Sequence, residues 1–214
     1  MASSTQSPGP VALMNSSGSL SGKPRGIPDG FALWRRLDQP GHEAARIVFH
    51  NPLWQLNGNA VFAHEGRPCG LEYLIVCDSN WTTLRARVAG WVGDRRINYQ
   101  IWADSERRWT VNGSARPEVS GCIDLDLAFS PSTNLIPIHR LRLGLGEEAE
   151  VCAAWLGFPD FILEPLVQVY RRSGNTTYRY ESSGGSFATD LEVNDAGLIV
   201  RYPGRWEMES PTRG

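Results

Sequence analysis

The chain has 214 residues, a formal net charge of −2 and 21% charged residues. So balanced a charge provides no electrostatic footprint for nucleic acid or for an anionic membrane surface. Eight tryptophans and 22 glycines favour strands and turns over helices, and a domain of this size buries enough surface to fold without disulfides or a metal.

The two ends of the chain differ in composition from the part between them. Residues 1–30 are rich in Ser, Gly and Pro and carry few large apolar side chains. Such a segment cannot bury enough surface to offset the entropy lost on ordering. We therefore expect a disordered tail at 1–30, a single folded domain at 31–207 and a frayed terminus at 208–214.

The N-terminal sequence lacks the basic region and the long apolar stretch of a secretory signal. No run approaches the roughly 18 apolar residues of a membrane span. These features predict a cytoplasmic protein without a membrane span. None of the cysteines forms a CxxC pair, and reduced thiols are expected in that compartment. The four cysteines are Cys69, Cys77, Cys122 and Cys152.

From residue 70 onward the dominant pattern is an alternation of apolar and polar residues. In residues 70–78, Leu71, Tyr73 and Ile75 share one face, as in a β-strand. An Asn-Gly pair at 112–113 is typical of a hairpin turn. Turn signals at intervals of about eight to twelve residues predict an all-β meander, roll or barrel. Further strands are expected at 84–92, 96–103, 121–129, 149–156, 165–172, 176–182, 186–193 and 197–202.

Residues 133–142 break this alternation. The preceding turn, FSPSTN, supplies hydroxyl and amide side chains that can cap a helix. Pro137 fits a first helical turn better than a central strand, and Leu135, Ile138 and Leu141 recur at helical spacing. These features favour a short helix at about 133–142, with an edge strand as the alternative.

Several segments together carry a resemblance to a known family. They are LDQPGHE (37–43), CDSNWTTLRARVAGWVG (77–93), GCIDLDLAFSPSTNLIPIHRL (121–141), AAWLGFPDFILEPLVQVY (153–170), YRYES (178–182) and LEVNDAGLIVRYPG (191–204). From about Trp34 to Trp206 the chain resembles the bacterial family named Putative glycolipid-binding. This resemblance implies a mainly β fold, a spiral β-roll in which one long, curled antiparallel sheet wraps around a single short helix. The fold is similar to that of lipoprotein carriers that bind acyl chains, which implies a glycolipid or another lipid-like ligand.

Residues 121–141 concentrate polar side chains among apolar ones. In a strand, Asp124 and Asp126 point to the same face, roughly 7 Å apart, which would suit a general acid and base or two ligands of a hard cation. The interpretation we favour is structural. Arg140 follows a tight turn and can fold back onto either aspartate as a bidentate partner, while Asn134 can satisfy backbone groups at the turn. These four residues would then join the sheet to the helix.

The alternative is an uncharacterised hydrolase or isomerase that uses Asp124, Asp126 or His139. The sequence has no GxSxG motif to supply a nucleophile, so we assign no catalytic residue. The histidines lack the spacing of a transition-metal site, and no glycine-rich loop opens a helix after a parallel strand. Neither a metal nor a cofactor is therefore expected.

Aromatic residues carry the case for ligand binding. Eight tryptophans are many for the core of one domain, so some are expected to line a cavity or concave face, where aromatic rings stack on sugars or pack on acyl chains. The alternative is that they fill the interior. We predict a non-catalytic protein that holds an amphipathic ligand, while an exposed sheet edge leaves dimerisation open. The ligand-binding residues predicted are Trp34, Trp81, Tyr178 and Tyr180.

Overall fold

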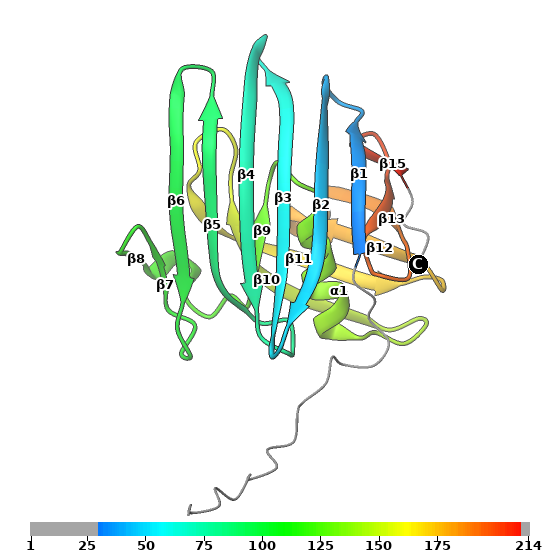
Figure 1. Cartoon of the computed structure of the whole chain (residues 1–214). Helices are drawn as coiled ribbons and strands as arrows, with labels where there is room; N and C mark the ends of the chain where they lie inside the picture. The colour runs from blue at the N-terminus through cyan, green and yellow to red at the C-terminus, as the bar shows by residue number, and fades with distance from the viewer. Residues whose placement is uncertain (1–29, 211–214) are drawn as a thin grey trace, which may run out of the picture.

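The computed structural model describes residues 30–210 (Figure 1). The tail expected at 1–30 lies almost wholly outside the described residues, as do the last four residues of the chain. Residues 208–210 were expected to fray. Instead they belong to the last strand, where Met208 pairs with Trp34 of the first strand. Backbone hydrogen bonds to a neighbouring strand hold them in place.

The first half of the described chain forms eight antiparallel strands, each paired with the next along the sequence. The predicted turn at Asn112 and Gly113, both with positive φ, joins the last two. The strands are β1 (Gly30–Arg36), β2 (Gly41–His50), β3 (Leu53–His64), β4 (Arg67–Cys77), β5 (Thr83–Val92), β6 (Arg95–Ala103), β7 (Trp109–Val111) and β8 (Ser114–Arg116).

The second half completes the same sheet from its other edge. Its strands are β9 (Asp124–Leu127), β10 (Glu148–Leu156), β11 (Leu163–Arg172), β12 (Thr177–Ser182), β13 (Phe187–Val193), β14 (Ile199–Tyr202) and β15 (Trp206–Ser210). β15 pairs with β1, so the two ends of the described chain meet in the middle of the sheet, and β8 and β9 are its edges. β9 pairs with β10 in parallel, which is the one exception among the described strands to the expected antiparallel sheet.

The sheet curls over on itself without closing into a barrel. In Figure 1, β1 to β6 form a front layer, β10 to β13 lie behind it, and the helix α1 (Leu135–Leu141) lies between the two layers. A 3₁₀ turn at Ser132–Asn134 leads into α1. The prediction of a spiral β-roll around one short helix at about 133–142 is therefore confirmed. None of the helices within residues 30–210 has the length and hydropathy needed to cross a membrane.

Large apolar side chains and α1 fill the space that the curled sheet encloses. Residues 135–138 of α1 are all buried. Strand β3 alternates more and less buried positions along its length, as a strand with one face on a core requires. Five of the eight tryptophans are buried in this interior: Trp34, Trp54, Trp81, Trp109 and Trp206. The alternative in which indoles fill the roll therefore holds for most of them.

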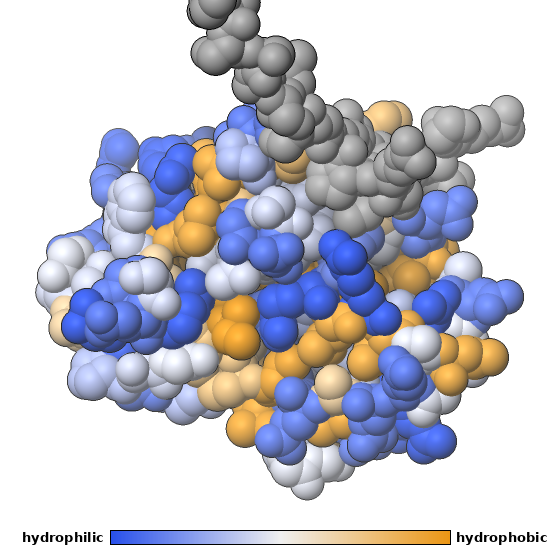
Figure 2. All heavy atoms as spheres, turned by 90° about the horizontal axis from the view of Figure 1, so that it is seen from below, coloured by the Kyte–Doolittle hydropathy of each residue, from blue (hydrophilic) through white to orange (hydrophobic). Residues whose placement is uncertain are grey.

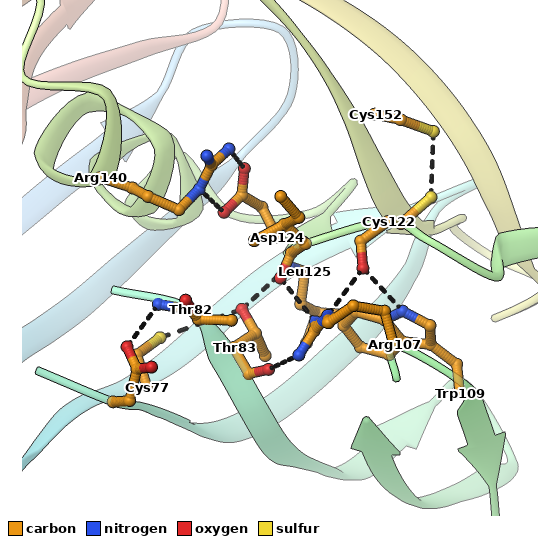
Figure 3. Close-up of polar contacts among 12 residues, drawn as sticks. Cys77, Thr82, Thr83, Arg107, Trp109, Cys122, Asp124, Leu125, Arg140 and Cys152 are labelled. Carbon is orange, nitrogen blue, oxygen red and sulfur yellow. Dashed lines mark hydrogen bonds and ion pairs between the residues drawn. The ribbon is translucent and has the colours of Figure 1, made fainter. Parts of the chain in front are cut away.

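A bidentate ion pair joins the edge strand β9 to α1. The Nε and Nη2 atoms of Arg140 donate to the two carboxylate oxygens of Asp124 at 2.8 and 2.6 Å (Figure 3). The Asp124 side chain is only 1% exposed. Of the two aspartates that the sequence offered to Arg140, the structure pairs it with Asp124.

Asp126 and Asn134 bind other partners near the same junction. Asp126 accepts hydrogen bonds from Thr133 Oγ1 at 2.6 Å and from Gln168 Nε2 at 2.7 Å. Asn134 donates to the backbone oxygen of Pro131 and accepts from the Tyr170 hydroxyl. Asp126 thus ties the turn before α1 to β9 and β11, and Asn134 secures the turn itself.

A second cation, the half-buried Arg107, holds the segment that leads into β9. Its guanidinium donates to the backbone oxygens of Cys122, Thr83 and Ile123 at 3.1, 2.7 and 2.7 Å (Figure 3). Three carbonyl acceptors satisfy a half-buried guanidinium well. This contact joins β5 in the first half of the sheet, through Thr83, to the segment before β9 in the second half, through Cys122 and Ile123.

We expect Arg140→Met to lower the free energy of unfolding by roughly 3–5 kcal/mol, because the change leaves the Asp124 carboxylate buried without its cation. Urea denaturation followed by circular dichroism measures the loss. The double variant Arg140→Met, Asp124→Asn should recover a large part of it, since no buried charge is then left unpaired. Equal stability of Arg140→Met and the wild type would contradict the structural role of the pair.

Candidate functional site

A pocket of about 290 Å³ opens on the inner face of the second half of the sheet. This volume lies at the low end of the range for small-molecule sites, about 300–1,000 Å³. β1 and β9 to β15 contribute to it, together with the turn before α1. Its lining comprises Arg36, Asp126, Leu127, Ala128, Ser130, Asn134, Trp155, Leu166, Tyr180, Ser182, Ser183, Phe187, Tyr202, Arg205 and Trp206.

The outer surface of the sheet is a weaker candidate for a ligand site. A larger hollow of about 610 Å³ crosses β1 to β5, but several of the side chains that line it are exposed, including Phe31 and the surface ion pair of Glu72 with Arg87. On the one face seen from below (Figure 2), hydrophobic and hydrophilic residues are intermixed rather than separated into one broad apolar patch. The pocket is therefore the better candidate for a specific ligand.

Three aromatic rings from consecutive strands form one wall of the pocket. Tyr180 of β12, Phe187 of β13 and Tyr202 of β14 pack pairwise with ring centroids 6.1–6.3 Å apart. The guanidinium of Arg205 lies 5.1 Å from the centroid of the Phe187 ring. The result is an apolar surface of mutually supported rings with a cation at its rim.

The cation on the other side of the pocket, Arg36, is already engaged. Its Nε and Nη2 atoms donate to both carboxylate oxygens of Asp38 at 3.0 and 2.9 Å. Its guanidinium also lies 4.8 Å from the centroid of the Trp206 ring. A bidentate carboxylate neutralises this charge locally, so Arg36 serves as part of the wall rather than as an anion receptor.

The floor of the pocket is polar. Gln168 links Asp126 to the Tyr180 hydroxyl through its amide nitrogen, at 2.7 and 3.1 Å. Burial raises the pKa of Asp126, while the hydrogen bonds from Thr133 and Gln168 lower it. A carboxylate has about four lone-pair sites, and these two bonds, together with one from the backbone N–H of Leu127, leave one of them open. The floor can therefore accept a further hydrogen bond from a ligand.

A buried glutamate, Glu43, lies behind Ser130 of the pocket lining. Ser130, which lines the pocket, donates to Glu43 Oε1 at 2.6 Å, and the Tyr73 hydroxyl donates to the same oxygen at 2.6 Å. Glu43 Oε2 has no hydrogen-bond partner among the described residues. Burial raises the pKa of Glu43 from its ordinary value of 4.5 to about 7, against the lowering effects of Ser130, Tyr73 and Arg36.

Sequence reasoning did not single out Glu43, although a signal was present. In β2, Glu43, Ala45 and Ile47 share the buried face. A carboxylate on the apolar face of a strand is rare unless it has polar partners. The alternation of β2 could therefore have identified Glu43 as an unusual buried acid, but it could not have named Ser130 as its partner.

All four predicted ligand-binding aromatics are buried, and one of them reaches the pocket. Tyr180 lines the pocket. Tyr178 is 6% exposed and belongs to a core cluster around Tyr170 and Leu191. Trp34 is fully buried, and its indole nitrogen donates to the backbone oxygen of Ile199 at 2.6 Å. Inward-facing positions of a sheet curled this tightly meet the opposite layer, so these side chains fill the core.

Trp81 lies in an aromatic stack that also contains His139. Its ring stacks on Trp54 and on His139, each at a centroid distance of 4.6 Å. His139 Nε2 makes a hydrogen bond with the backbone oxygen of Ala196 at 2.8 Å, and burial lowers the pKa of His139. His139 is thus held by core packing, just as Asp124 is held by Arg140.

These contacts give structural partners to all three residues of the catalytic alternative, and nothing in the arrangement supports it. Within residues 30–210, no group of three or more His, Cys, Asp or Glu side chains is placed to hold a metal ion. What the geometry offers is an aromatic wall, a polar floor and a volume of about 290 Å³. A concave site of this kind is a candidate for binding a small molecule.

Comparison with known proteins agrees with this class. The chain belongs to the family described as Putative glycolipid-binding, which it matches over residues 31–208. A binding role is therefore supported at the level of the family. No curated protein matches the chain.

Two solved structures are similar to the fold. The crystal structure of a DUF1089 family protein from Pseudomonas aeruginosa has a TM-score of 0.68 and 29% sequence identity, covering 77% of this chain and 91% of that one. A β-barrel-like protein of the domain of unknown function DUF1849 from Brucella abortus has a TM-score of 0.51 at 7% identity, covering 84% and 94%. The second likeness concerns the fold alone.

We expect Glu43 to make stability depend on pH. Between about pH 4.5 and 7, an acid whose pKa is raised to about 7 in the folded state is protonated in the folded protein but ionised in the unfolded chain. The free energy of unfolding that Glu43 contributes is therefore present below pH 4.5 and falls as the pH rises to 7. Glu43→Gln removes this dependence, so its stability relative to the wild type should rise by about 3 kcal/mol from pH 4.5 to 8.

Urea denaturation of both proteins across this pH range measures the effect. Glu72→Gln, on the exposed face of β4, is the matched control for the loss of one carboxylate. A stability difference between Glu43→Gln and the wild type that stays constant with pH would contradict the raised pKa.

Proposed function

We propose that the protein binds a glycolipid-like amphiphile and holds the sugar head group in the pocket. The observation that carries this proposal is the pairing of an aromatic wall, formed by Tyr180, Phe187 and Tyr202, with a polar floor that includes Asp126 and Asn134. Membership of the Putative glycolipid-binding family supports the same class of ligand.

The chemistry of a sugar fits both surfaces. A pyranose ring carries C–H groups on its faces, which pack on aromatic rings, and hydroxyl groups around its edge, which need hydrogen-bond partners when they leave water. Asp126 supplies an acceptor, while Asn134 and Ser182 supply groups that can donate or accept. Arg205 at the rim can donate to an outer hydroxyl.

The size of the pocket favours the head group, rather than the acyl chains, as its occupant. About 290 Å³ is at the lower limit for a small ligand, and the neighbouring interior is filled by α1 and by buried indoles such as Trp34. An acyl chain would therefore run outward past Trp155 and Leu166, which are partly exposed at the lining. The protein would act as a binder without a chemical step.

The proposal predicts that octyl glucoside, below the concentration at which it forms micelles, binds more tightly than octanol. We expect about a tenfold difference, equivalent to about 1.4 kcal/mol. Isothermal titration calorimetry with the two ligands measures it. The same affinity for both would show that the sugar is not recognised and would overturn the proposal.

We expect Phe187→Leu and Tyr202→Leu each to weaken the binding of octyl glucoside by about 3- to 10-fold. Each change keeps an apolar side chain but removes a ring, and aromatic packing contributes roughly 0.5–1.5 kcal/mol. Arg201→Ala is the control, because Arg201 shares β14 with Tyr202 but lies outside the pocket in an exposed ion pair with Glu192. An equal loss in Arg201→Ala would argue against binding in the pocket.

A further inference from the structure

Two cysteines from different segments meet beside the edge strand β9. Cys122 lies just before β9, and Cys152 lies within β10. Their sulfur atoms are 3.0 Å apart, with either thiol able to donate to the other (Figure 3). This separation is shorter than the usual contact between two unbonded sulfur atoms, so a small rotation about the side chains would bring them to the bonding distance of about 2.05 Å.

The backbone holds this pair together independently of the thiols. The backbone oxygen of Cys122 accepts hydrogen bonds from Arg107 Nε at 3.1 Å and from Trp109 Nε1 at 2.9 Å. Cys152 is fixed by the parallel pairing of β10 with β9, in which Asp124 is opposite Ala153. The approach of the two sulfur atoms is therefore a consequence of the fold, and the thiols are preorganised for a reaction with each other.

The other two cysteines differ in this respect. Cys69 is near the backbone oxygen of Arg67, at 3.8 Å, and Cys77 is near the hydroxyl of Thr83, at 3.9 Å. Both are buried within the first half of the sheet. They serve as internal controls for oxidation at Cys122 and Cys152.

We propose that Cys122 and Cys152 form a site of oxidative modification, at which a hydroperoxide converts the two thiols into an intramolecular disulfide. In the first step the Cys152 sulfur attacks the peroxide, which is reduced to an alcohol or water as Cys152 becomes a sulfenic acid. In the second step the Cys122 sulfur attacks the Cys152 sulfur. The S–O bond breaks, the S–S bond forms, and the hydroxyl group leaves as water with the Cys122 proton.

Exposure decides which sulfur meets the oxidant first. Cys152 is partly exposed, whereas Cys122 is buried. Burial and the neighbouring Cys152 raise the pKa of Cys122 to about 12, so Cys122 remains a thiol near neutral pH and reacts slowly with peroxide. It is suited to the resolving step, which takes place inside the protein.

The disulfide would close a loop over the elements that carry the floor of the pocket. β9, the turn before α1, and α1 itself all lie between Cys122 and Cys152 in the sequence. Closing this loop restricts the unfolded chain, so oxidation should stabilise the fold. The inference does not depend on the identity of any ligand.

The test treats the full chain with stoichiometric hydrogen peroxide and measures its intact mass and its thermal midpoint. We expect a loss of two hydrogen atoms, a cross-linked peptide containing Cys122 and Cys152, and a rise in Tm of about 5–10 °C, reversed by dithiothreitol. Cys69→Ser should behave as the wild type does. Cys122→Ala and Cys152→Ala should each lose the mass change and the Tm rise.

Cys152→Ala changes a partly exposed residue and should fold even if Cys122→Ala does not. A gain of oxygen without loss of two hydrogen atoms would overturn the inference, because it would mean that sulfenic acid forms but is not resolved. A disulfide between two chains, or one that includes Cys69 or Cys77, would overturn it as well. An unmodified protein after treatment would do the same.

Discussion

The bidentate ion pair between Asp124 and Arg140 is the contact on which the arrangement of sheet and helix depends. β9 has four residues and a single paired strand, β10. α1 has seven residues, well below the roughly 12–15 at which an isolated helix becomes stable in water. Neither element is stable alone, so the ion pair between Asp124 in β9 and Arg140 in α1 fixes the position of each against the other. Burial of Asp124 makes the pair specific, because no other described side chain offers this carboxylate a bidentate cation.

The pocket follows from the same junction. Asp126 lies two residues after Asp124 in β9, and Asn134 lies at the start of α1, so the contact that positions the helix also positions the polar floor. The aromatic wall comes from β12, β13 and β14, which belong to the other end of the second half. Floor and wall face each other only because the sheet curls, and Gln168 joins them by bonding both Asp126 and Tyr180.

Much of the fold was predictable from the sequence, but the partners of its polar groups were not. Period-two alternation and the Asn112–Gly113 turn identify strands from local geometry, and Pro137 with its neighbours identifies the helix. The choice of Arg140 between Asp124 and Asp126 depends on how α1 packs, which no local pattern encodes. The parallel pairing of β9 with β10 could not be predicted for the same reason. The number of tryptophans does not show whether they line a pocket or fill the core, because the outcome depends on how tightly the sheet curls.

Glu43 shows how the two halves of the molecule influence the chemistry of the pocket. It comes from β2 in the first half, whereas its partner Ser130 comes from the segment before α1. A serine hydroxyl has one proton, and at 2.6 Å that of Ser130 is directed at Glu43 Oε1. The same oxygen accepts from the backbone N–H of Ser132 at 3.1 Å and lies 2.7 Å from the Ser132 hydroxyl, so Ser130 is held within this buried network. The acceptor that the floor offers to a ligand is therefore Asp126, which suits the hydroxyl donors of the proposed sugar head group.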